Sequence, residues 1–537
     1  MRLKRHLNLI ANDFFKYLGR HFPQQCASDE FYFLPRAEVA IQHQSSLDDL
    51  NPDIIQDHIK YVQNLLNEIL REKLDDLEGE IDRLLLKQSM ESFIREFNDI
   101  EVWRNDPTLY VKIPLFATDQ IISRENRTAD QVKTSLSSLF AQIPAFLCLA
   151  LKNLRSPSEI ALEVALNMTR DAIYFHSHDI RTYIEEKMGD DKGLLSRNTE
   201  ALEAWKRYER ELLQQPARNS FAIGKDGLRE IVAVSLSYFK SPEEILEIAQ
   251  YAYQKTQEKL HALARKIDSC KTWNLIIYEN PPSVSSPEGV LPLYQKEVQS
   301  LRRFFYSRDI VTFPIKEKVI VLRTPSCLQS LRATASYRSP LTGDTDSHGL
   351  FYITPGEENL ELISNHCAYI SAHETYPGHH ILDHIRIHHS NPIRRQIESP
   401  LFYEGWACYA EQLLNELGYI RDPRHQLIGL KRQLWRCLRA ILDVKLQTEK
   451  STPAQAAEEI ETLGYSSKTA QRQVRRFCLT PGYQLCYFTG MNEIIRLREK
   501  FSSRMGLKPF HDTLLSGGEI PFYLVGKRLE KCLVEKS

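Results

Sequence analysis

The sequence predicts a mainly α-helical protein, with a large multi-helix body and a small β-sheet in the middle of the chain. Three observations favour this fold class. Long stretches repeat apolar residues every three or four positions, several stretches open with a capping residue followed by proline, and β-branched residues gather near mid-chain. The first two features are typical of amphipathic helices, and the third is typical of strands.

The clearest helix is expected over residues 51–70. Asn51 followed by Pro52 suits an N-cap and a first helical turn. The apolar residues of the segment recur at alternating steps of four and three, which places them on one helix face: Ile55, Ile59, Val62, Leu66 and Ile69. Three later segments also begin with a hydroxyl residue, proline and then acidic residues, which predicts helix starts near residues 156, 240 and 451.

Strand-like sequence is concentrated between residues 271 and 355. The stretch 273–290 is rich in proline, serine and glycine and is expected to be a loop. Segments 311–324 and 349–355 are rich in β-branched and aromatic residues, which predicts short strands. We therefore expect one compact unit with three regions: a helical N-terminal region 1–270, a strand-containing segment 271–355, and a helical region 356–537 that carries the chemistry.

The composition is that of a globular protein, since 42% of the 537 residues are hydrophobic and 26% are charged. A formal net charge of −1 predicts no nucleic-acid partner. The longest apolar run, residues 143–151, is too short to span a bilayer and contains Pro144, so no membrane association is expected. The N-terminus has no apolar signal segment and the ten cysteines include no C-x-x-C pair, so we expect a cytoplasmic protein with reduced thiols.

The stretch SAHETYPGHH, residues 371–380, carries the first candidate for chemistry. His373 and Glu374 open it like the zinc-peptidase motif H-E-x-x-H, in which two histidines four residues apart share one helix face. Pro377 stands where the second histidine belongs. The next histidine, His379, would lie about 240° round an unbroken helix, away from His373.

Pro377 and Gly378 are expected to change this geometry. Proline removes a backbone donor and clashes with the carbonyl group four residues earlier, which is that of His373. Glycine permits unusual backbone angles. We expect the helix to bulge or break here and to return His379 to the side of His373, which makes His379 the second ligand and His380 the alternative.

A third ligand is expected on the following apolar helix. Catalytic zinc takes three protein ligands of nitrogen or oxygen type and keeps one position open for water. Glu404, in the stretch SPLFYEGWACYAE, is a carboxylate at a suitable distance along the chain. Glu411 lies seven residues later on the same helix face and could orient a ligating imidazole.

These motifs resemble those of the bacterial family known as domain of unknown function 885. HETYPGHH and YEGWACYAE are similar to its H-E-x-x-P-G-H-H and E-G-W-A signatures. LWRCLRAILDVKLQ and RRFCLTPGYQLCYFTGMNEIIRLR resemble its R-x-x-R…D and P-G-Q-x-x-x-Y-x-x-G segments. The sequence departs from the family at Gln447, where a histidine is frequent, and at Tyr483, where the last motif has glutamine. These departures concern specificity more than the metal site.

The family looks like a relative of the gluzincin metallopeptidases. The resemblance implies a gluzincin-like architecture with one Zn²⁺ per chain. It also implies His373, His379 and Glu404 as the metal ligands, and Glu374 as the catalytic base that works on a metal-activated water.

The function predicted from these residues is that of a zinc-dependent hydrolase, with a peptide or small amide as substrate. Tyr487 is the first candidate to stabilise the developing oxyanion, and His511 is a weaker one. Arginine can bind a substrate carboxylate through its planar fork, and three arginines of the last region are candidates: Arg436, Arg439 and Arg476. Strand 349–355 could add a peptide by strand pairing. The alternatives are a metal-dependent amidohydrolase that acts on a small non-peptide metabolite, and a non-catalytic scaffold.

Overall fold

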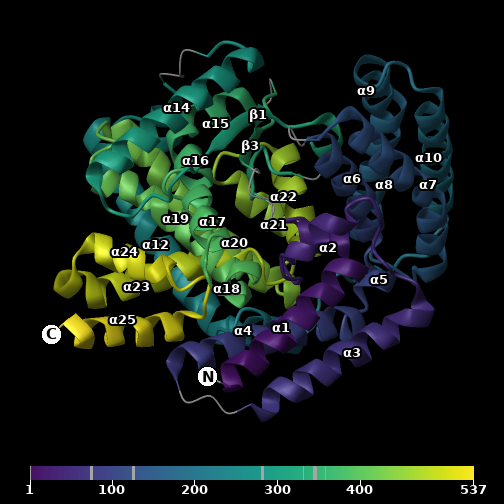
Figure 1. Ribbon diagram of the computed structural model, residues 1–537. Coiled ribbons are helices and arrows are strands. Elements are labelled where there is room, and N and C mark those ends of the chain that lie inside the picture. The colour runs from purple at the N-terminus through teal and green to yellow at the C-terminus, as the bar shows by residue number, and fades with distance from the viewer. Residues whose placement is uncertain are drawn as a thin grey trace. The chain divides into compact units, whose positions relative to one another are not determined.

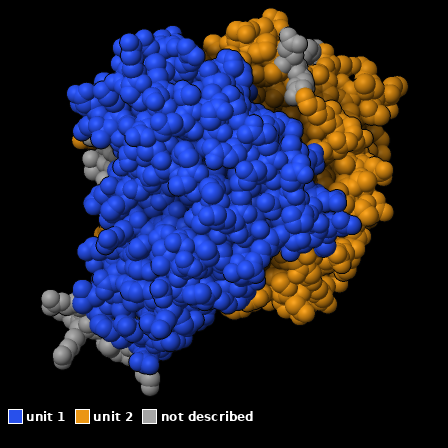
Figure 2. Space-filling model, turned by 90° about the vertical axis from the view of Figure 1, so that its right-hand side faces the viewer, with its two compact units in different colours: residues 1–221, 324–333, 341–347 blue, residues 222–323, 334–340, 348–537 orange. Residues whose placement is uncertain are grey.

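The computed structural model confirms a mainly helical chain with a small three-stranded mixed sheet in its middle (Figure 1). It describes residues 2–72, 76–123, 127–279, 284–329, 332–340, 342, 348–356 and 359–536. The chain forms two compact units, which Figure 2 colours separately. Unit 1 comprises Met1–Phe221, Thr324–Ala333 and Leu341–Ser347, and unit 2 comprises Ala222–Arg323, Thr334–Pro340 and His348–Ser537.

Unit 1 is built from helices that follow one another along the first part of the chain, with one short helix, η5 (Ser326–Leu328), from a later segment. They are α1 (Arg2–His21), α2 (Pro23–Ala27), η1 (Glu38–His43), α3 (Pro52–Arg71), α4 (Leu77–Ile94), η2 (Arg95–Asp99), α5 (Val102–Asn105), α6 (Pro107–Ile122), α7 (Ala129–Asn153), α8 (Glu159–Tyr174), η3 (Phe175–Asp179), α9 (Ile180–Lys187), α10 (Lys192–Leu212) and η5 (Ser326–Leu328).

Unit 2 contains the sheet and all the predicted site residues. Its first helices are α11 (Gly224–Glu230), η4 (Ile231–Ser235), α12 (Pro242–Ile267), α13 (Trp273–Tyr278) and α14 (Pro287–Arg308). The strands β1 (Val319–Arg323), β2 (Ala335–Arg338) and β3 (Gly349–Ile353) follow. The last helices are α15 (Leu360–Asn365), α16 (Cys367–Glu374), α17 (His379–Ile387), α18 (Pro392–Gln396), α19 (Pro400–Glu416), α20 (Pro423–Gln447), α21 (Pro453–Glu461), α22 (Ser467–Leu479), α23 (Leu485–Met505), α24 (Leu507–Leu515) and α25 (Phe522–Lys536).

Most of the predicted helix starts are found in the structure, each with a capping side chain at its first turn. In α3 the Asn51 side chain accepts a hydrogen bond from the Asp53 amide, Pro52 is the first helical residue, and the predicted apolar stripe is buried. Ser241 and Thr452 form capping boxes at the starts of α12 and α21. The start near residue 156 is shifted, because Ser158 rather than Ser156 caps α8.

The loop predicted over residues 273–290 is wrong at both ends. Trp273–Tyr278 forms α13, because it buries an apolar face that includes Trp273, Ile276 and Ile277. At the other end Pro287 opens α14, with Ser286 at the N-cap. Residues 280–283 lie outside the described part of the chain.

The two predicted strands are confirmed as β1 and β3, although β1 occupies only the last part of segment 311–324. The sheet order is β1-β3-β2, with β1 parallel and β2 antiparallel to β3. Because β3 is paired along both edges, peptide addition to strand 349–355 is wrong as a prediction. The edge strands are β1 and β2, and β2 was not predicted.

One helix among the described residues is long and apolar enough to cross a membrane by length and composition, and it is α7. It contains the run 143–151 with Pro144 inside it. One face of α7 is buried and packs against α6 and α10. The buried residues of this face recur at helical spacing: Val132, Leu136, Leu139, Phe140, Ile143, Phe146, Leu147 and Ala150.

Candidate metal centre

The helix break predicted at Pro377–Gly378 is confirmed. Helix α16 ends at Glu374, and α17 begins at His379. Between them the chain turns sharply, so that the Gly378 amide donates to the carbonyl oxygen of Ala372 over 3.0 Å. A Cβ atom at position 378 would overlap the carbonyl oxygens of Ala372 and His373. Glycine is therefore required by close approach, and the turn places His379 beside His373.

Three candidate ligands converge at this turn. Nε2 of His373 lies 3.4 Å from Oε2 of Glu404, and Nε2 of His379 lies 3.6 Å from the same oxygen. The two imidazole rings are 4.7 Å apart and nearly perpendicular. The ligand atoms all lie within 4.8 Å of one another and all three residues are buried. Helices α16, α17 and α19 supply one residue each.

The two carboxylate oxygens of Glu404 have different surroundings. Its Oε1 accepts a hydrogen bond of 2.7 Å from the Tyr483 hydroxyl group. Its Oε2 is buried, has no hydrogen-bond partner among the described residues, and faces both imidazoles. A buried carboxylate oxygen without a partner is costly. Two imidazoles and one carboxylate are a donor set that suits Zn²⁺, so the residues present fit the ion that the sequence predicts.

His373 is also held from its other side. Its Nδ1 lies 2.9 Å from Oε1 of Glu411, which itself pairs with Arg432 and Arg436. Burial raises the pKa of Glu411, but the two arginines outweigh burial and hold it well below its usual range. Because Glu411 is already neutralised by two cations, it suits the orientation of His373 better than the binding of an ion.

A second group, made of His373, Glu411 and the Cys408 thiol, also has ligand atoms within 4.8 Å of one another. It shares His373 with the first group and depends on the carboxylate that the arginines already hold. The group with His379 and Glu404 is therefore the better candidate.

Glu374 lies beside the ligands with a buried carboxyl group. The Tyr337 amide of β2 donates to its Oε2 over 2.9 Å. Burial raises the pKa of Glu374, and the nearby imidazoles of His373 and His379 offset this only in part. A carboxylate with a raised pKa next to a ligand is suited to accept a proton at neutral pH.

Tyr487 is placed near the ligands by a close contact of α19 with α23. The Tyr487 ring stacks at 6.4 Å from the ring of His373. Burial raises the pKa of the Tyr487 phenol, and the Glu404 carboxylate adds to this increase despite the nearby Arg439. The phenol therefore stays protonated and able to donate. The two helices approach closely because Gly405 and Gly490 face each other.

The three predicted substrate-binding arginines have different surroundings. Arg436 is buried against Glu411. Arg439 lies 3.4 Å from the centre of the Tyr487 ring and donates to Oε1 of Gln484. Arg476 is half-buried, and its charge lowers the pKa values of Tyr483 and Tyr487 against the effect of burial. Arg439 and Arg476 both act on Tyr487, and Arg476 acts on Tyr483 as well.

His380 and His511 belong to other hydrogen-bond networks. Nε2 of His380 lies 2.9 Å from Glu317, and its Nδ1 lies 3.1 Å from the Tyr337 hydroxyl group. His511 bonds the Tyr409 hydroxyl group at 2.9 Å and the Ile310 carbonyl group at 2.7 Å. Both ring nitrogens of each histidine are therefore engaged away from the ligand group.

Sequence reasoning missed three residues that shape the site. Tyr483 holds Glu404, and Tyr337 holds Glu374 through its backbone. Asp443 accepts hydrogen bonds from the amides of Gly482 and Leu485 and so fixes the turn that carries Tyr483. The P-G turn signal before Tyr483 was visible in the sequence, whereas the contact of β2 with Glu374 had no local signal.

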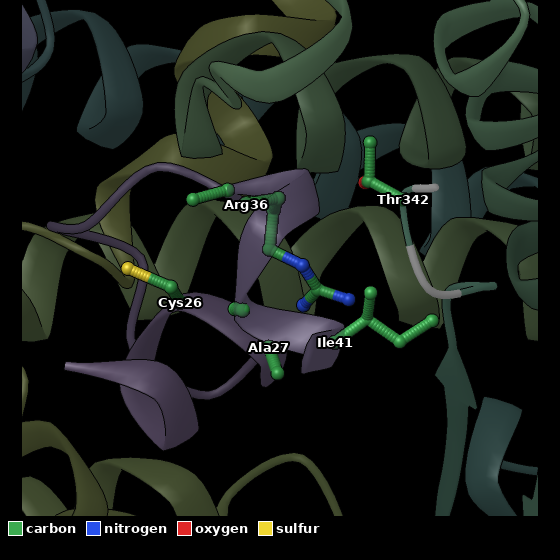
Figure 3. A pocket seen from close by; sticks show the side chains of 7 residues that line it. Cys26, Ala27, Arg36, Ile41 and Thr342 are labelled. Atoms are coloured by element: carbon green, nitrogen blue, oxygen red, sulfur yellow. The ribbon is translucent and has the colours of Figure 1, made fainter. Parts of the chain in front are cut away.

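A small pocket also lies in unit 1, and its lining includes Cys26, Arg36 and Thr342 (Figure 3). It contains none of the predicted site residues, which all belong to unit 2. The pocket therefore adds nothing to the ligand group described above.

The profile of a bacterial protein family of unknown function, DUF885, matches residues 36–529. The chain belongs to this family. The match includes every predicted site residue and confirms the resemblance stated above. A relation to the gluzincins is not part of that match and is considered under the proposed function.

Two solved structures share the DUF885 chain's fold. One is of a putative lipoprotein of unknown function from Shewanella oneidensis, with a TM-score of 0.73, 20% identity, and 90% of this chain and 94% of that chain covered. The other is of a putative lipoprotein from Colwellia psychrerythraea, with a TM-score of 0.82, 18% identity, and 99% of each chain covered. No curated protein matches the sequence. At these identities the likeness is one of fold alone.

Proposed function

We propose that this chain is a zinc-dependent hydrolase that cleaves peptide bonds. The observation that supports the proposal most is the buried Oε2 of Glu404, which has no hydrogen-bond partner in the described residues and faces Nε2 of His373 and of His379. A second buried carboxylate, Glu374, lies beside them. Three ligands of this kind leave one position for water, as in catalytic zinc sites. The resemblance to gluzincins is consistent with this assignment.

Each residue around the ligands has a defined task. When bound, the ion would lower the pKa of a water molecule and polarise the substrate carbonyl group. Glu374 takes the proton of the water and returns it to the leaving amine, while the Tyr337 amide holds its carboxylate in place. Tyr487 donates to the oxygen on which negative charge develops. Glu411 keeps the His373 ring oriented.

The sheet edge beside Glu374 favours an extended substrate. The Tyr337 amide points to Glu374 rather than to β3, so the outer edge of β2 runs along the catalytic carboxylate. A peptide that pairs with an edge strand gains backbone hydrogen bonds that a small metabolite lacks. Arg476 is the arginine best suited to meet a substrate carboxylate, since its charge acts on Tyr483 and Tyr487.

The metal assignment is tested by elemental mass spectrometry on Glu404→Ala and wild type. We expect the variant to lose one zinc per chain, because the only carboxylate of the ligand group is removed. Glu416→Ala is the matched control, since Glu416 is an exposed glutamate at the end of the same helix. A Glu404→Ala protein that keeps the wild-type zinc content rules out this ligand group.

The catalytic assignment is tested with Glu374→Gln and a peptide library. The variant keeps the shape of the side chain and the zinc, and it loses the proton acceptor, so hydrolysis should fall by roughly 10²–10⁴-fold. Undiminished turnover would remove Glu374 from the mechanism. Cleavage of small amides but of no peptide in the library would favour the amidohydrolase alternative.

The compartment is a separate part of the proposal. The sequence predicts a cytoplasmic protein, whereas both similar structures are of proteins described as lipoproteins, which points to the cell envelope. We propose the cytoplasm, because the nine cysteines that the structure describes are all free thiols. Fractionation of cells that express the native gene tests this location. Recovery in the envelope fraction would overturn this location while leaving the metal site untouched.

A further inference from the structure

Unit 1 contains a second cluster of metal-binding side chains, far along the sequence from the first. His21 is the last residue of α1, Asp49 lies in the loop before α3, and His58 lies within α3. One ligand atom from each residue lies within 4.8 Å of the others. None of these residues belongs to the motifs that identify the family, and the proposed hydrolase uses none of them.

Asp49 faces both histidines at distances longer than an ordinary hydrogen bond. Oδ2 of Asp49 lies 3.9 Å from Nδ1 of His21 and 3.8 Å from Nε2 of His58. Both separations exceed hydrogen-bond range. In a tetrahedral zinc site two ligand atoms, each about 2.0–2.2 Å from the ion, lie about 3.3–3.6 Å apart, slightly closer than these two pairs. The spacing therefore suits atoms that share an ion better than atoms that share a proton.

His58 supplies the strongest evidence for a ligand. Its side chain is 3% exposed, and Nε2 is buried with no hydrogen-bond partner among the described residues. Its other nitrogen, Nδ1, lies 2.7 Å from the Tyr17 hydroxyl group. In metal sites the second nitrogen of a ligating imidazole is held by such a partner, which fixes the tautomer and the ring orientation. Tyr17 is itself fixed by stacking on Tyr61 at 3.8 Å.

The backbone around Asp49 is held in place before any ligand binds. The Asp49 amide donates to the carbonyl oxygen of His21 over 2.8 Å, which ties two of the three residues together. The neighbouring Asp48 accepts from the amides of Gln24 and Gln25 at 2.7 and 3.1 Å. The loop is thus anchored to the end of α1 and to α2, so only small side-chain rotations are needed to close the site.

We propose that His21, Asp49 and His58 form a second divalent metal site, selective for a transition metal of the Zn²⁺ type. Two imidazoles and one carboxylate favour such ions over Ca²⁺ or Mg²⁺, which prefer oxygen ligands. The side chains of His21 and Asp49 are 30% and 33% exposed, so the ion is reached from solvent and keeps room for water. The position of His21 at the C-terminal end of α1 also favours a cation.

The inference is tested on the full chain with Co²⁺ as the probe, by equilibrium dialysis and visible absorption. In a Glu404→Gln background, which disables the first site, we expect one Co²⁺ per chain. Adding Asp49→Asn or His21→Gln should weaken this binding at least 10-fold, because each removes one of three ligands. Asp57→Asn is the matched control: Asp57 is an exposed acid next to His58 in sequence and is outside the ligand group, so binding should change by less than 3-fold.

The outcomes separate this inference from the proposed function. Binding that survives Glu404→Gln and falls with Asp49→Asn supports the second site, whatever the first site does. Binding that Asp49→Asn leaves unchanged, or that the control reduces equally, overturns it. If the Glu404→Gln protein does not fold, the same comparison is made in wild type. There Asp49→Asn should lower the number of bound Co²⁺ ions by one, and an unchanged number overturns the inference.

Discussion

Replacing Gly490 by alanine should separate the two helices that carry the site. A Cβ atom at position 490 would lie 2.8 Å from Cα of Gly405 and would overlap the carbonyl oxygen of Leu401. Carbon atoms in ordinary contact lie about 3.5–4.0 Å apart. Helices α19 and α23 would therefore have to move apart by about 1 Å. Overpacking of this kind costs about 1–3 kcal/mol of stability, and backbone contacts leave little room for relief.

The same movement should impair the site. Gly405 follows Glu404 on α19, and Gly490 is three residues after Tyr487 on α23. A separation of about 1 Å would break the 2.7 Å bond from Tyr483 to Glu404, and misplacement by this amount can cost about 10²-fold in rate. Thermal unfolding, zinc content and peptide hydrolysis measure the three effects.

Gly526→Ala provides the matched control. Gly526 also lies in a helix, α25, and a Cβ atom there would meet only Cδ2 of Leu497, at 3.7 Å. Alanine is favoured over glycine in a helix interior by about 0.8–1.0 kcal/mol, so this variant should be as stable as wild type or more stable. If Gly490→Ala unfolds at the wild-type temperature and keeps its zinc, the reasoning about the helix contact is wrong.

Two further predictions concern single side chains. Tyr483→Phe removes the hydrogen bond to Glu404, so zinc affinity should fall by roughly 10–100-fold; a competition with a chelator measures it, and unchanged affinity would contradict the role of Tyr483. Burial lowers the pKa of His511 from 6.5 to about 4, although its bond to the Ile310 carbonyl group opposes this. The folded state therefore excludes a proton that the unfolded chain binds. The contribution of neutral His511 to the free energy of unfolding is complete above pH 6.5 and is lost as the pH falls from 6.5 to 4. The loss is about 3 kcal/mol. Denaturation at several pH values measures the free energy of unfolding. This free energy should fall less steeply between pH 6.5 and 4 for His511→Asn than for wild type, and equal slopes would refute the assignment.

Helix starts and the break at Pro377–Gly378 could be predicted because they depend on residues close in sequence. Asn51 caps α3 through its own side chain, and proline forbids a continuous helix whatever packs around it. The loop predicted over 273–290 failed because proline and serine also open helices. Ser286 and Pro287 start α14 there.

The parts of the site that could not be predicted depend on residues far apart in sequence. Tyr337 donates to Glu374 from a strand of four residues, which is too short to show a periodic pattern. Glu411 meets Arg432 and Arg436 only because α19 and α20 pack together. A carboxylate on a helix gives no sign in the sequence of which cation it will meet, so the separate tasks of Glu404 and Glu411 became visible only in the fold.

Glu404 and Glu411 differ in role because different charged groups surround them. Glu404 and Glu411 lie on the same helix and both contact His373, from its Nε2 and Nδ1 sides. Burial raises the pKa of each, and in each case neighbours reverse the shift, but the neighbours differ: two imidazoles lower the pKa of Glu404, whereas two guanidinium groups lower that of Glu411. Imidazoles can exchange a proton for a metal ion, whereas guanidinium groups stay charged and repel one. The arginines would therefore favour an ion on the Glu404 side of His373 and would leave Glu411 to hold the ring.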